Sequence, residues 1–149
     1  MPKFERQVEI EAPVETVWAI MTNPEQWPLW FPGIEAVSDV SGITPGGTFH
    51  WQDEGRTGVG SIVNLEPNER LEIMTQMGDD KDSHLFELKA DRGFLGFGAS
   101  HGCRVDYTLD TLMGGGILAQ FFAGGNPKDT LRVKRALDSL KDLVEGQGR

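Results

Sequence analysis

The order of the predicted secondary structure constrains the fold of this chain more than any other feature. An alternating apolar strand over 4–11 leads directly into Ala12–Trp18, and the aromatic cluster Trp27–Pro32 follows soon afterwards. Many strands and one long last helix complete the chain. A sheet with one apolar face needs a layer that covers this face. We therefore predict an α+β helix-grip fold, in which a curved seven-stranded antiparallel sheet and two short helices surround a long C-terminal helix.

Helix signals are clear at three places. Val14, Val17, Trp18 and Met21 recur at helical spacing between residues 13 and 23. Asn23 precedes Pro-Glu, a combination typical of a helix start, which predicts a second helix from 24 to about 32. A third helix is predicted from 127 to about 145. Its apolar stripe consists of Val133, Leu137, Leu140 and Val144.

Turn residues divide the middle of the chain into strands. Gly, Pro, Asn or Asp stands at each boundary. The predicted strands after the second helix are 34–40, 48–53, 57–66, 70–77, 83–91 and 100–112.

The turns also predict which residues face one another, because directly opposed residues of an antiparallel pair share one face of the sheet. A turn at 54–56 sets Trp51 against Val59, and a turn at 67–68 sets Leu65 against Leu71. The other predicted pairs are Phe49 with Ser61, Val63 with Ile73, Ser61 with Thr75, Ile73 with Leu88, Thr75 with Phe86, Phe86 with Val105, and His84 with Tyr107. The predicted inward set also includes Met77, Ala90 and Leu109.

Composition limits the possible functions. The 149 residues fit a single domain, 1–149, that can bury a core without disulfides. A formal charge of −9 argues against nucleic acid or an anionic membrane surface as a partner. No apolar stretch reaches the length of about 20 residues that a membrane span requires. The single cysteine, Cys103, and the absence of a secretory pattern lead us to expect a cytoplasmic protein.

The sequence resembles the START-like (SRPBCC) superfamily, which includes pollen-allergen-like ligand carriers and polyketide cyclase/dehydrase-like proteins. The matching features are Ala12–Trp18, Trp27–Pro32, the Arg104-Val105 step, and a last helix with Leu137, Leu140, Lys141 and Leu143. Cys103 stands where a threonine is expected, and residues 124–127 interrupt a last helix that is usually continuous. The resemblance implies a cavity for lipids, sterols, hormones or polyketides, or cyclisation chemistry in such a cavity.

A small polar group is predicted to face inward, and it contains the candidate catalytic residues His84 and Tyr107. An imidazole beside a phenol could orient a ligand oxygen or move a proton. Alternatively, the two side chains hydrogen-bond each other or water. Trp51 could stack on a flat ring, or fill the core.

Other site classes are less well supported by the sequence. His50 and His101 are predicted to face outward, far from His84, so no metal site is expected. Ser61 and Cys103 lack the motif of a nucleophile, and we interpret them as small packing residues. The glycine-rich stretch 93–98 departs from the phosphate-binding pattern.

These observations predict a protein that binds a hydrophobic small molecule, without a cofactor, between the sheet and the last helix. An enzyme of the polyketide cyclase/dehydrase type, with His84 or Tyr107 as proton shuttle, is the alternative. A protein–protein module acting through Phe94 to Phe97 is a third hypothesis, and a homodimer is possible. The predicted ligand-binding residues are Phe49, Trp51, Ser61, Ile73, Thr75, Met77, His84, Phe86, Val105, Tyr107, Phe122, Val133 and Leu137.

Overall fold

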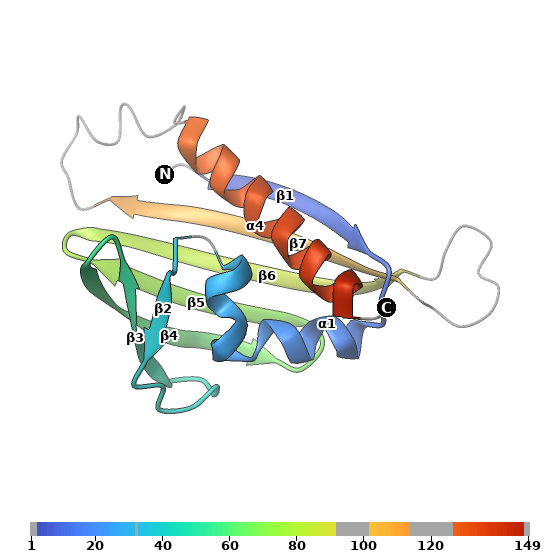
Figure 1. The fold of residues 1–149 in the computed structure, drawn as a ribbon, viewed down its shortest axis with the longest axis horizontal. Coiled ribbons are helices and arrows are strands. Elements are labelled where there is room, and N and C mark those ends of the chain that lie inside the picture. The colour runs from blue at the N-terminus through green and yellow to red at the C-terminus, as the bar shows by residue number, and fades with distance from the viewer. Residues whose placement is uncertain (1–2, 32, 92–101, 114–126, 148–149) are drawn as a thin grey trace.

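The computed structural model describes residues 3–31, 33–91, 102–113 and 127–147 (Figure 1). Its helices and strands lie within a few residues of the predicted ones, and the helix-grip α+β fold is confirmed. The elements are β1 (Lys3–Ile10), α1 (Val14–Met21), the 3-10 helix η1 (Pro24–Gln26), α2 (Trp27–Trp30), β2 (Ala36–Ser38), β3 (Thr48–Asp53), β4 (Arg56–Glu66), β5 (Arg70–Met77), β6 (Asp80–Asp91), β7 (Gly102–Met113) and α4 (Pro127–Gln147).

All seven strands form one antiparallel sheet in the order β1-β7-β6-β5-β4-β3-β2. Helix α4 crosses one face of this sheet obliquely, and α1 and α2 lie beside it (Figure 1). The Asn23 side chain accepts a hydrogen bond from the Glu25 N–H, as expected for a cap at the start of η1. The covering layer therefore consists of the three elements whose start and stop signals the sequence contains.

Helix α4 covers the concave face with the apolar stripe that its sequence predicts. The side chains of this stripe are at most 2% exposed, and they are Val133, Ala136, Leu137, Leu140 and Val144. Fully burying such side chains contributes about 1.5–3 kcal/mol for each of the larger ones. This packing therefore holds the helix on the sheet.

The C-terminal half of α4 is also tied to β1 by polar contacts. The Lys141 ammonium donates to the Glu9 carbonyl over 2.7 Å, and the Glu11 N–H donates to Glu145 Oε2 over 2.9 Å. Lys141 and Glu145 pair with each other at 2.8 Å. These contacts fix the end of the helix that lies away from the β3–β4 and β5–β6 turns.

The register of β4 differs from the predicted one because of a bulge. Leu65 lies opposite Leu71 as predicted, but the register shifts between Ile62 and Asn64. Beyond this point Ile62 rather than Val63 faces Ile73. The predicted inward positions of Val59, Ser61 and Val63 are therefore wrong, as are the pairs Val63–Ile73 and Ser61–Thr75. The pairs Trp51–Val59 and Phe49–Ser61 are wrong because the β3–β4 turn has two residues, 54 and 55, rather than the predicted three.

Two glycines take the inward positions that this shift vacates. Gly58 lies opposite Trp51 and Gly60 opposite Phe49. A Cβ atom on Gly60 would lie 2.2 Å from the Phe49 ring. The aromatic rings of β3 thus lie on the bare backbone of β4, and small residues there are a packing requirement.

The two following hairpins keep the predicted faces but not the predicted partners. Thr75 lies opposite Asp82 rather than Phe86, and Phe86 lies opposite Tyr107 rather than Val105. The partner of Thr75 differs from the predicted one by four residues, and the partner of Phe86 by two. Because both differences are even numbers, every side chain of β5, β6 and β7 stays on its predicted face. The predicted pairs Ile73–Leu88 and His84–Tyr107 are also replaced, by Ile73–His84 and His84–Leu109.

None of the helices in the described part of the chain is both long and apolar enough to cross a bilayer.

Replacing Gly60 with Ala should reduce the free energy of unfolding by about 1–3 kcal/mol, because the new methyl group would force the buried Phe49 ring from its site. Urea unfolding followed by circular dichroism would measure the loss. Gly146→Ala is the matched control, since its Cβ would meet nothing within 4 Å in α4. A Gly60→Ala protein as stable as the Gly146→Ala protein would contradict the packing role.

Candidate functional site

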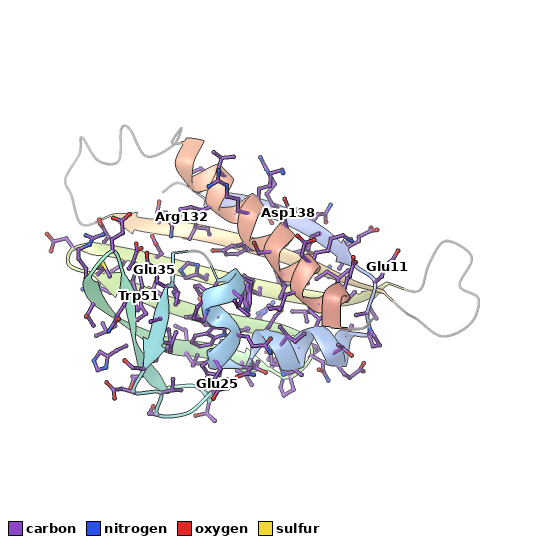
Figure 2. The ribbon with its side chains drawn as sticks, in the orientation of Figure 1. Glu11, Glu25, Glu35, Trp51, Arg132 and Asp138 are labelled. Atoms are coloured by element: carbon purple, nitrogen blue, oxygen red, sulfur yellow. The ribbon has the colours of Figure 1, made fainter. Side chains whose placement is uncertain are left out.

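A pocket of about 610 Å³ opens where the β3–β4 and β5–β6 turns meet the N-terminal part of α4. We call it the end pocket. Figure 2 shows Trp51 on β3 and Arg132 on α4, which both line it. Its described lining consists of Gly33, Trp51, Asp53, Glu54, Arg56, Thr75, Met77, Asp80, Asp82, Leu131, Arg132 and Arg135.

Tight turns place several of these residues at the pocket. Glu54 and Gly55, both with positive φ, form the two-residue turn between Asp53 and Arg56. A second two-residue turn with Gly78 at φ 62° joins Met77 to Asp80. Because both turns lie at the same end of the sheet, they bring four strand ends to one opening.

Trp51 provides an apolar wall with a fixed orientation. Its indole N–H donates to the Val59 carbonyl over 3.1 Å, and the ring lies against Gly58, where a Cβ would approach it to 2.6 Å. Met77 and Leu131 add apolar surface from β5 and α4. A large aromatic ring held in this way offers a ready packing surface to a ligand.

Thr75 carries a hydroxyl at the pocket wall that continues into the core as a chain of hydrogen bonds. Thr75 Oγ1 lies 3.0 Å from His84 Nε2, and His84 Nδ1 lies 2.6 Å from the Tyr107 hydroxyl. All three side chains are buried: Thr75 is 4% exposed, His84 1% and Tyr107 0%. Thr75 is the member of the chain that lines the end pocket.

Aromatic side chains pack around His84 in the core, and His84 is not part of the described lining of the pocket. Phe31 packs edge-on against the imidazole at a ring distance of 4.8 Å, and Phe86 stacks on Tyr107 at 4.4 Å. Trp30 packs on Phe86 from α2. Burial, together with the charge of Arg132, lowers the pKa of His84 to about 3. His84 is therefore a neutral imidazole at physiological pH, with one nitrogen donating and the other accepting.

Charged side chains surround the rest of the opening. Arg132 Nη2 lies 3.2 Å from Asp82 Oδ2, which joins α4 to β6 across the pocket. Within the described ranges, the other charged lining residues have no ion pair; they are Asp53, Glu54, Arg56, Asp80 and Arg135. The pocket thus combines an apolar wall, a hydroxyl and a charged rim.

The predicted site residues separate into groups. Trp51, Thr75 and Met77 line the end pocket. Ser61 pairs with Met74 on the opposite face, so its predicted place in the site is wrong. Phe122 lies outside the described residues. The remaining predicted residues belong to the packed core and are at most 2% exposed: Phe49, Ile73, His84, Phe86, Val105, Tyr107, Val133 and Leu137.

The sequence analysis missed Asp82 and Arg132. The sequence did contain a signal for Asp82. Residues two apart in a strand share one face, so Asp82 lies on the same face of β6 as the inward-facing His84 and Phe86. Because the predicted strand began at Ser83, Asp82 was assigned to the preceding turn. Arg132 directly precedes the apolar stripe of α4, and nothing in the sequence indicated a partner 50 residues earlier in the chain.

The alternative chemistries gain no support from the geometry. Within the described residues, no group of three His, Cys, Asp or Glu side chains could hold a metal ion. His50 lies 3.0 Å from Asp39 on the exposed surface, and His101 is outside the described ranges. Burial raises the pKa of Cys103 to about 11, which leaves a protonated thiol at neutral pH. The glycine-rich stretch 93–98 and residues 124–126 also lie outside the described part.

The family model described as "Polyketide cyclase / dehydrase and lipid transport" matches residues 1–145. The chain belongs to this family. A search of the curated proteins finds no match.

Solved structures share the fold of this polyketide cyclase/dehydrase and lipid transport family member at low identity. A Mesorhizobium loti protein is 14% identical with a TM-score of 0.71, covering 97% of both chains. The Aha1 dimer of Colwellia psychrerythraea is 19% identical with a TM-score of 0.64, again over 97% of both chains. DynU16, from the dynemicin biosynthetic locus, is 17% identical with a TM-score of 0.66, over 97% of this chain and 48% of that one.

The buried, neutral state of His84 predicts a specific pH dependence of stability. Its folded-state pKa of about 3 lies below the unfolded value of about 6.5, so the unfolded state binds the extra proton in between. This contribution to stability is fully present above pH 6.5. It is lost at up to about 1.4 kcal/mol per pH unit as the pH falls towards 3.

Urea unfolding of the wild-type protein and a His84→Gln variant between pH 7.5 and 4.5 would measure the contribution of His84 to the free energy of unfolding. The carboxylates are common to both proteins, so the difference between the two curves reports His84. Parallel curves, or an imidazole that titrates near pH 6.5 by NMR, would contradict the assigned state.

Proposed function

We propose that this protein binds a small, largely hydrophobic molecule with one polar oxygen in the end pocket. The observation that carries this proposal is the combination of a fixed indole wall with a hydroxyl that a buried hydrogen-bond chain holds in place. The family description supports a hydrophobic ligand, and the volume of about 610 Å³ suits a small molecule.

The apolar part of the ligand would pack between Trp51, Met77 and Leu131. Leu131 is 46% exposed, although it is a large apolar side chain on a helix that otherwise turns its apolar stripe to the sheet. Covering such a side chain removes apolar surface from water, at about 25 cal/mol per Å². This burial would provide most of the affinity.

The polar oxygen of the ligand would be recognised by the Thr75 hydroxyl. A neutral imidazole gives the chain of hydrogen bonds one direction at a time. When Tyr107 donates to His84, His84 donates to Thr75, and the Thr75 O–H points to the ligand. In the reverse direction, Thr75 donates to His84 and its oxygen accepts from the ligand. The site can therefore receive a carbonyl or a hydroxyl group.

The enzyme alternative remains a prediction that this geometry supports less well. A general base works best when its pKa lies near the working pH. His84 has a pKa of about 3 and packs against Phe31, and both His84 and Tyr107 are buried. Neither group is part of the described lining of the end pocket, whereas Thr75, the hydrogen-bond partner of His84, is. The interaction module through Phe94 to Phe97 falls outside the described residues, and a homodimer stays a prediction.

Binding of the neutral dye N-phenyl-1-naphthylamine tests this function, together with native mass spectrometry for co-purified molecules. Thr75→Val should weaken binding of an oxygen-bearing ligand, such as 2-naphthylmethanol in dye displacement, by about 2–10-fold through the lost hydrogen bond. It should also lower stability, because His84 Nε2 loses its partner.

Thr75→Ser keeps the hydroxyl and should restore most of the affinity. Ser61→Ala removes a hydroxyl from the opposite face and should leave binding unchanged. A protein that purifies without a bound molecule and binds neither compound would contradict the proposed function. Equal affinities of the Thr75→Val and Thr75→Ser proteins for 2-naphthylmethanol would remove Thr75 from the site.

A further inference from the structure

We propose that the end pocket selects neutral amphiphiles over anionic ones of the same shape, and that Asp82 sets this preference by neutralising Arg132. This inference rests on the proposed function and adds the chemical class of the ligand. It would make Asp82 a specificity-determining residue.

The position of Asp82 makes it the neighbour of any polar group that reaches Thr75. The two residues lie directly opposite each other on β5 and β6, on the same face of the sheet. Asp82 Oδ2 is 3.2 Å from Arg132 Nη2, and both side chains line the pocket. The oxygen-binding hydroxyl and the ion pair therefore belong to one polar corner.

The ion pair is partly shielded from water. The side chain of Asp82 is 20% exposed and that of Arg132 is 34% exposed. Charges in such surroundings interact more strongly than they do in bulk water. An incoming anion that takes Arg132 from Asp82 would break this partly shielded ion pair, and breaking such a pair is costly.

The remaining lining charges do not compensate for an anion. Three arginines face four carboxylates around the pocket, which leaves the described lining with a net charge of −1. The whole chain carries −9, which also disfavours the approach of anions at long range. A neutral carbonyl or hydroxyl needs only the Thr75 hydrogen bond and leaves the Asp82–Arg132 pair intact.

Two dyes with a common skeleton test the inference. N-Phenyl-1-naphthylamine is neutral, and 8-anilino-1-naphthalenesulfonate adds one sulfonate to the same rings. Fluorescence titration at pH 7.5 should show at least about tenfold tighter binding of the neutral dye. In Asp82→Asn, Arg132 no longer faces the Asp82 carboxylate, so the difference in affinity between the two dyes should narrow to about threefold or less, mainly through tighter binding of the sulfonate.

Three variants separate this explanation from a general charge effect. Asp53→Asn removes one negative charge from the pocket rim without breaking an ion pair of the described residues. Asp106→Asn removes one negative charge and breaks an ion pair outside the end pocket, because Asp106 pairs with Arg104 at 3.4 Å. Both should retain most of the selectivity. Asp82→Asn combined with Arg132→Gln should lose the gain in sulfonate affinity that Asp82→Asn alone produces, because the Arg132 guanidinium is absent.

The outcomes distinguish this inference from the function on which it rests. Failure of the wild-type protein to bind the neutral dye would contradict both. If the neutral dye binds but the sulfonate binds equally well or better, only the charge preference is overturned. Asp53→Asn narrowing the difference as much as Asp82→Asn would also overturn it, since the effect would then come from net charge. Unfolding curves of each variant confirm that folded proteins are compared.

Discussion

The packing of Phe31 against His84 and Phe86 determines where this fold can hold a ligand. A helix-grip fold places a helix over a curved sheet, and the space between them is either filled or left open. Here the aromatic side chains that follow η1 fill it, and Phe86 stacks on Tyr107 beneath them. The end pocket lies beyond these rings, at the end of the sheet that faces the N-terminal part of α4.

This packing also decides what His84 can do. Burial of an imidazole disfavours its charged form, and the nearby guanidinium of Arg132 acts in the same direction. The imidazole has a hydrogen-bond partner on both nitrogens and is buried, so in the proposed function it acts through Thr75 rather than on a ligand directly. A residue that resembles a catalytic base in the sequence becomes an internal support for a hydroxyl.

The sequence predicted the elements well because each boundary has a local cause. The Asn23 cap, the turn at 67–68 and the apolar stripe of α4 depend only on neighbouring residues. Pairing depends on the size of each turn, and there the prediction erred. The strand after Met77 resumes after two residues rather than five, which moved Asp82 opposite Thr75 and brought a carboxylate to the site.

The bulge in β4 was harder to predict, since either of two alternating sets of residues in this strand could face inward. Val59, Ser61 and Val63 form one plausible inward set, and Gly58, Gly60 and Ile62 form the other. Branched apolar residues ordinarily favour the inward face, so the first set appeared better. The neighbouring strand reverses that choice, because Phe49 and Trp51 need space that only glycine leaves.

The Arg132–Asp82 pair shows why the recognition chemistry of the pocket could not be predicted from sequence. Its two residues are 50 positions apart, and their distance depends on how far α4 slides along the sheet when its apolar stripe packs. A displacement of one helical turn, about 5.4 Å, would preserve an apolar stripe yet separate the charges. The hydrophobic pattern thus specifies that α4 covers the sheet, whereas side-chain packing sets the register on which the Arg132–Asp82 pair, and with it the proposed ligand selectivity, depends.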